Sequence, residues 1–308
     1  MNTFLHITNI GQKYAISSLE DNIKGFLDWS FLNIGAYVNV EIPTSGLYGS
    51  NFHTLKPVTD PSQKAKLWEA PRKDWVYENC TSGNYSAIQI SGINLNGTFL
   101  PGPTGSGTYS YTMNYPLGRI SFDNNVSSSS TVTMEYSYRY VQVYKANESA
   151  WWKELQSQTY NPANFSSTGD SSITANHRIQ LPAIIVETIP RTVLIPRELG
   201  TTQNVVIQDV LLHIFAENIG QRNNLTEILV MQKDNTLALY DVNKVVKEDK
   251  FPINSNGSIN PSGYSYPCLT TNYRRQWCTI KDSTITELNT ISSALYNGIV
   301  RWSIEIFP

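Results

Sequence analysis

The stretch NVVIQDVLLHIFAENIGQRNNLTEILVMQKDNTLALYD, residues 204–241, decides the fold of the C-terminal half of this chain. Residues 204–217 are long and mostly apolar, which is typical of a buried β-strand. Residues 220–232 show helical spacing, and TLALYD, residues 236–241, indicates a second strand. A strand, a helix and a strand in this order predict an α+β domain whose sheet is covered by one helix.

The predicted helix has an apolar stripe and a polar side. Leu225, Ile228 and Leu229 recur at helical spacing and are expected to face the sheet formed by 204–217 and 236–241. The polar side is expected to carry Arg222, Asn223, Thr226 and Glu227. Because a polar helix face stays available to another molecule, Arg222 and Glu227 are candidate interface residues.

The N-terminal region predicts a helix followed by a connector. KYAISSLEDNIKGFLDWSFL, residues 13–32, has helical spacing, and Gly35 ends the region. The apolar side chains on one face of this helix are Ile16, Leu19, Ile23, Phe26 and Leu27. Residues 36–75 are rich in turns and contain short alternating runs, so they predict an ordered but irregular connector.

Residues 76–145 carry a strong β signal. Short alternating runs recur every 8–12 residues or so, which indicates a β-sandwich-like module or a small barrel. LNG predicts a hairpin turn at Gly97, and PLG predicts another at Gly118. STVTMEYSYRYVQVY, residues 130–144, places its tyrosines on one strand face. Such a face is either a packing layer or a contact surface, because the ring packs while the hydroxyl needs a partner.

These signals divide the chain into three parts: 1–75, 76–145 and 146–308. The third part begins with ESAWWKELQS, which predicts a short helix. Its adjacent tryptophans, Trp151 and Trp152, cannot both face one small core. One of them is therefore expected to insert into a neighbouring molecule, where aromatic anchors carry much of the binding energy.

The composition favours interfaces over chemistry. Only 16% of residues are charged, against roughly 25% in an average soluble protein, and the formal net charge is -2. This balance gives no general attraction to nucleic acid or to an anionic membrane. No signal peptide and no run of 18 apolar residues is present. We therefore expect a soluble protein made in a cytoplasm, with reduced thiols at Cys80, Cys268 and Cys278; a Cys268–Cys278 bridge is a minor alternative.

No catalytic, metal or cofactor signature is recognisable. The histidines His6, His53, His177 and His213 are scattered without the close pairs that metal sites use. His213 lies in an apolar run and is interpreted as a hydrogen-bonded strand residue. GPTGSG lacks the following helix that would present amides to a phosphate, and YRRQWC is interpreted as a solvated strand end. A glycosidase carboxylate pair is not recognisable, although that class is not excluded.

Several segments resemble a family of virion structural proteins of tailed bacteriophages. They are FLDWSFLNIGAYVNVEIP, LWEAPRKDWVYE, YPLGRISFD and the series NHRIQLPAIIVETIPR, ELG, QDVLLHIFAEN and RNNLTEILVMQKD. Members of this family are called structural, neck or connector proteins. The strand–helix–strand order of the C-terminal half is also similar to tail-terminator proteins, which form rings at the head-proximal end of the tail.

The resemblance implies a non-enzymatic neck or connector protein at the head–tail junction. It implies a six-fold or twelve-fold homo-oligomeric ring around the DNA channel, other neck and tail proteins as partners, and passive contact with channel DNA. The expected location is the virion, after assembly in the host cytoplasm, with no cofactor and no membrane contact. The alternatives are a tail-associated adaptor, collar or receptor-binding module that uses the tyrosine-rich strands and, less favoured, a glycan-cleaving tail enzyme.

Overall fold

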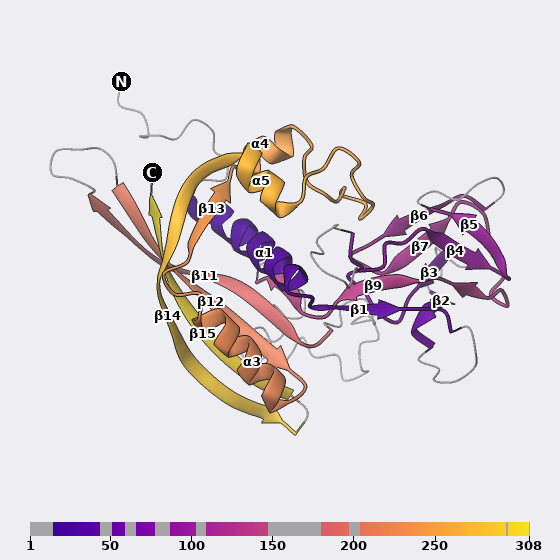
Figure 1. Ribbon diagram of the computed structural model, residues 1–308, viewed down its shortest axis with the longest axis horizontal. Helices are drawn as coiled ribbons and strands as arrows, with labels where there is room; N and C mark the ends of the chain where they lie inside the picture. Colours follow the sequence, from indigo (N-terminus) through magenta and orange to yellow (C-terminus); the bar gives the residue numbers. More distant parts are fainter. Residues whose placement is uncertain are drawn as a thin grey trace, which may run out of the picture. The chain divides into compact units, whose positions relative to one another are not determined.

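The computed structural model in Figure 1 divides the chain into two compact units. It describes residues 15–43, 51–58, 66–77, 87–102, 109–146, 180–196, 204–293 and 295–307. The sheet–helix unit comprises Met1–Asp28, Val143–Lys250 and Tyr264–Pro308, and the β unit comprises Trp29–Gln142 and Phe251–Gly263. The N-terminal helix α1, Ala15–Asn33, contributes residues to both units.

The sheet–helix unit is built on a six-stranded sheet with the order β10-β11-β12-β15-β14-β13. The strands are β10 Gln142–Lys145, β11 Ala183–Pro196, β12 Asn204–Ala216, β15 Leu295–Phe307, β14 Arg274–Ser292 and β13 Thr236–Tyr240. From β11 to β13 each neighbouring pair is antiparallel. Four long strands therefore form the centre of the sheet, and a short strand lies at each side.

Most of the buried apolar side chains lie on one face of this sheet, which we call the helix-covered face; a smaller buried cluster around Ile185 and Phe215 lies on the other face. Helix α3, Ile219–Val230, begins at Asn218, whose side chain accepts a hydrogen bond from the amide of Gln221. The indole Nε1 of the fully buried Trp302 donates to the carbonyl of Leu229 at 3.0 Å. The other fully buried side chains on the helix-covered face include Ile184, Val186, Val210, Leu212, Cys278, Ile280, Val300 and Ile304. Burial of these apolar groups is the main force that holds α3 on the sheet.

The first part of α1 packs on the same unit through specific polar contacts. The side chain of Asn22 accepts from the amide of Tyr240 at 2.8 Å and donates to its carbonyl at 3.2 Å. Glu20 accepts from both the amide and the hydroxyl of Thr188. Two short helices, α4 Val242–Lys247 and α5 Tyr266–Asn272, follow β13 and precede β14. The helix predicted at 13–32 is confirmed from residue 15 on, and Gly35 adopts a positive φ of 85° just after its end.

Strand β14 is long and strongly curved (Figure 1). Its pairing with β15 shifts register at Ile280/Asp282, Ile285/Glu287 and Thr290/Ser292, and its pairing with β13 shifts at Leu239/Tyr240. Each shift is a β-bulge, which adds one unpaired residue to β14 and increases the local bend and twist. The bulges therefore account for the curl of the sheet.

The β unit contains a seven-stranded antiparallel sheet with the order β5-β4-β8-β2-β3-β7-β6, and a separate pair, β1 with β9. The strands are β1 Tyr37–Val40, β2 Thr54–Pro57, β3 Leu67–Glu69, β4 Gly92–Leu95, β5 Thr98–Pro101, β6 Tyr111–Asn114, β7 Arg119–Phe122, β8 Val132–Thr133 and β9 Tyr136–Arg139. A 3₁₀ turn, η1 Asn51–His53, precedes β2. The sheet surrounds one core that includes Leu55, Trp68, Trp75, Ile93, Tyr111 and Phe122. The turns predicted at Gly97 and Gly118 are confirmed, and both glycines have positive φ.

The predicted α+β class is confirmed, and two details differ from the prediction. Strands β2 and β3 come from the predicted connector, yet they lie in the middle of the seven-stranded sheet. Helix α3 contacts β12, β15 and β14, whereas the prediction placed it over 204–217 and 236–241. The reason is that β15 and β14 lie between β12 and β13, so the two strands that flank the helix in sequence are not neighbours.

Candidate assembly surface

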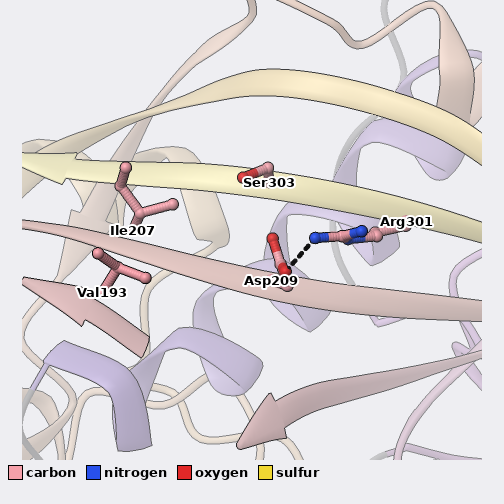
Figure 2. Close-up of a pocket in the computed structure, with 5 residues that line it drawn as sticks. All are labelled: Val193, Ile207, Asp209, Arg301 and Ser303. Atoms are coloured by element: carbon pink, nitrogen blue, oxygen red, sulfur yellow. Dashed lines mark hydrogen bonds and ion pairs between the residues drawn. The ribbon is translucent and has the colours of Figure 1, made fainter. Parts of the chain in front are cut away.

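The second face of the six-stranded sheet carries charged side chains, and we call it the polar face. Asp209 on β12 pairs with Arg301 on β15, and both line a cavity of about 200 Å³ (Figure 2). The remaining residues that line it are Val193, Ile207 and Ser303. Asp209 is only 5% exposed, so its carboxylate depends on the guanidinium for compensation. The pair neutralises the cavity and leaves its walls half apolar.

His213 lies further along the same face. Its Nε2 is 2.7 Å from Oε2 of Glu187, and the histidine is 6% exposed. This contact confirms the interpretation of His213 as a hydrogen-bonded strand histidine. The pair therefore fits a structural role.

Large apolar side chains are exposed along two of the long strands. On β14, Ile285 is 47% exposed, Leu288 46% and Ile291 53%. On β11, Val193 is 41% exposed and Ile195 44%. Single exposed apolar residues are common, but runs of them along one element mark surfaces that another molecule covers. These two strands are therefore the best candidate assembly surface in the described part of the chain.

The tyrosine-rich strand, in contrast, is mostly a packing layer. Tyr136 is fully buried, its ring lies 5.4 Å from that of Trp75, and its hydroxyl donates to the carbonyl of Phe52 at 2.8 Å. Trp75 also makes an edge contact with Tyr115 at 5.9 Å. Burial raises the pKa of Tyr136, and it raises the pKa of Tyr115 to about 12. Of the predicted tyrosine face, Tyr140 is the exposed member, at 38%.

The predicted interface residues have different environments. The prediction that Arg222 and Thr226 lie on the polar side of the helix is wrong, since both are buried. The guanidinium of Arg222 donates to the carbonyl of Asn289 at 3.1 Å and lies 6.0 Å from the ring of Tyr296. Glu227 is exposed, as predicted. Trp151 and Trp152 lie outside the described residues.

The described residues contain no group of three or more histidine, cysteine, aspartate or glutamate side chains placed to hold a metal ion. Cys268 and Cys278 are both free thiols, and burial raises the pKa of Cys278 to about 12. In the YRRQWC segment, the Arg274 guanidinium stacks 4.9 Å above the ring of Trp277, which is 45% exposed. His6, His177, Cys80 and most of GPTGSG lie outside the described residues.

Neither of two comparisons with known proteins places the chain in a family. No model of a known protein family matches the sequence, and no curated protein sequence matches it significantly. Within the described residues, none of the helices is both long enough and apolar enough to span a bilayer.

Proposed function

We propose that this chain is a non-enzymatic structural protein of a tailed-bacteriophage virion. In this proposal it forms a neck or connector ring at the head–tail junction, around the channel through which DNA passes. The observation that carries the proposal is the exposure of Val193 and Ile195 on β11 and of Ile285, Leu288 and Ile291 on β14. A chain with so few charged residues would hold this apolar surface in water at a cost, unless neighbouring subunits cover it.

The charges of the polar face fit a surface beside a DNA channel. Three acidic groups there each have a partner: Asp209 pairs with Arg301, Glu305 pairs with Lys281 at 3.6 Å, and Glu187 hydrogen-bonds His213. Unpaired cations would bind phosphates and slow the DNA, because each such contact adds salt-dependent affinity. A polar and locally neutral wall allows passive contact without retention.

The alternative, a tail adaptor, collar or receptor-binding module, depends on an exposed tyrosine surface. The burial of Tyr136 within the β unit weakens that argument. The third interpretation, a glycan-cleaving enzyme, needs two carboxylates on either side of a sugar. On the polar face Asp209 and Glu305 are paired with Arg301 and Lys281, and Glu187 hydrogen-bonds His213.

The proposal is tested by locating the protein in purified virions. Mass spectrometry of the particles should detect the chain, and a gold-labelled antibody should mark the junction between head and tail. Label along the tail or at its distal end would support the adaptor reading instead. Turnover of host-surface polysaccharide by the purified protein would contradict the non-enzymatic proposal altogether.

A further inference from the structure

The outer edge of β14 is paired over only part of its length. Strand β13 pairs with β14 from Arg274 to Thr279, and Ile280 then exchanges backbone hydrogen bonds with Asp234 and Asn235. Beyond that point, no strand of the described part of the chain pairs with the outer edge over 282–291. A strand edge of this length is a template for another strand.

The opposite side of the sheet has a similar arrangement. Strand β10 neighbours β11 near its beginning, where the amide of Ala146 donates to the carbonyl of Val186 at 2.9 Å. At Thr188 the side chain of Glu20 accepts from the backbone amide. From Thr192 to Pro196 no described strand lies on the outer edge. Among the described residues the sheet therefore has two different open edges, and each carries exposed apolar side chains.

The strand directions allow these two edges to meet. Because β11, β12, β15 and β14 alternate in direction, β14 runs antiparallel to β11. In a second copy with the same orientation, β11 would lie antiparallel to β14 of the first, and the alternation would continue. A pair of different edges is a heterologous contact, which generates a ring when the rotation closes.

The positions of the open edges also fit a closed arrangement. Leu194, in the middle of the β11 segment, pairs with Val206 on β12. On the other side Ile285 of β14 pairs with Val300 of β15, which in turn pairs with Leu212 of β12. That offset is six residues along β12, or about 20 Å at roughly 3.3 Å per residue. Crossing four strands spans about 19 Å. The edges therefore meet when the strands tilt by about 45°, at the upper end of the range for closed sheets.

The backbone of β14 is prepared for such a partner. Ile280 directs its N–H and C=O away from β15, since both bond to the 234–235 segment. In an antiparallel pair the backbone groups of alternate positions point toward and away from the partner strand. By this alternation the backbone N–H and C=O of Ile285 and of Leu288 also point away from β15. The guanidinium of Arg222 contacts the carbonyl of Asn289, next to this edge.

From these observations we propose that the 282–288 edge of β14 pairs with the 192–196 edge of β11 in a second copy of this chain. The partner is a copy because one sheet supplies both edges, with the required direction and offset. The inference rests on the proposed function only in taking the assembly to be a ring of identical subunits. β13 and β10 occupy the remaining parts of the two edges and do not compete for the same segments.

The test uses lysine substitutions in the full chain, because a lysine at a sheet edge opposes strand addition. The β14-edge variant is Ile285→Lys with Leu288→Lys, and the β11-edge variant is Val193→Lys with Ile195→Lys. Met231→Lys is the matched control, since Met231 is 78% exposed and lies at the end of α3 rather than on an edge. Oligomer mass is measured by light scattering or native mass spectrometry, and thermal unfolding checks that each variant folds.

Each edge variant should lose the oligomer, whereas the control keeps it. An equimolar mixture of the two edge variants should form a 1:1 dimer, because each contributes one intact edge. The proposal is overturned if the wild-type chain is monomeric at high concentration, if either edge variant keeps the wild-type mass, or if the mixture remains monomeric. The two proposals can fail separately. If the edge variants lose the ring but the protein is absent from the virion neck, the proposed function is overturned and this interface is kept.

Discussion

The tyrosine-rich segment 130–144 and the second half of β14, residues 282–292, have similar sequence patterns, but the first is mostly buried and the second is mostly exposed. Both alternate β-branched or aromatic residues with polar ones. In the first segment Val132, Met134 and Tyr136 are fully buried, whereas in the second Ile285 and Ile291 are about half exposed. The difference lies in the neighbours: the first segment is enclosed by strands from several parts of the chain, and the second lacks a strand on one side among the described residues. Aromatic content alone therefore does not identify a contact surface.

The largest loss of stability is expected when the strands that surround segment 130–144 are removed. A fragment of residues 76–145 lacks β2 and β3, which lie between β8 and β7 in the sheet. Without them the sheet is cut into two small parts, and such parts are at best marginally stable in water. We expect circular dichroism and NMR spectra of an unfolded chain. A cooperatively folded fragment would show that the buried segment does not need this enclosure.

One substitution in each of the two segments should show the difference between a buried and an exposed position in the free energy of unfolding. Tyr136→Ala removes a fully buried ring and should lower the free energy of unfolding by about 3–5 kcal/mol. Ile291→Ala removes a side chain that is 53% exposed at a bulge and should change it by less than about 0.5 kcal/mol. Urea unfolding of the full chain measures both. Equal losses would contradict the contrast between the two segments.

The helix beside the β14 edge offers a smaller contrast. Leu225→Ala should cost about 2–4 kcal/mol, because Leu225 is a buried residue of α3 and is only 5% exposed. Glu227→Ala, two residues further on the exposed side, should stay within about 0.5 kcal/mol of the wild type. Thermal unfolding compares the two variants. Similar melting temperatures would be inconsistent with the packing of α3 on β12 and β15.

The smallest effect concerns alkaline pH. Burial raises the pKa of Tyr111 and of Tyr115 to about 12, above the usual value of about 10. Because their folded-state pKa is raised, the stability they contribute is complete below about pH 10 and is lost as the pH rises towards 12. Tyr111→Phe removes one of these groups and its 3.0 Å hydrogen bond to the carbonyl of Leu100. The variant should be less stable at neutral pH, but its stability should fall less steeply above pH 10 in urea unfolding; an unchanged slope would count against the shift.

The sequence predicts elements whose signals are local. The spacing of Leu19, Ile23 and Leu27 predicts α1, and the Asn96–Gly97 pair predicts a hairpin because both residues tolerate positive φ. Strands β2 and β3 have only four and three residues, too few for a periodic signal. They pair with each other, and their other partners, β8 and β7, lie about 50 or more residues away, so sequence alone leaves them in a connector.

The candidate surface depends on contacts that the sequence does not display. A helical pattern places Arg222 on the polar side, but its guanidinium finds the carbonyl of Asn289, 67 residues away. On β14 the bulges shift the alternation between Ile280, Ser283 and Leu288, so the pattern resembles several short segments instead of one strand. At Val193 and Ile195 β11 has no described strand on its outer side, because β10 neighbours only its beginning, and only the strand pairing reveals this.

The bulges in β14 also have a consequence for how this protein tolerates changes of length during evolution. Deleting a paired residue would move every later side chain of the strand to the opposite face. Deleting a bulge residue such as Thr286 would leave the partners and faces on both sides unchanged and would only straighten the strand. Insertions and deletions at these positions can thus adjust the curvature of the sheet while its core remains the same. Related chains of slightly different length could in this way form sheets of different curvature with the same buried side chains.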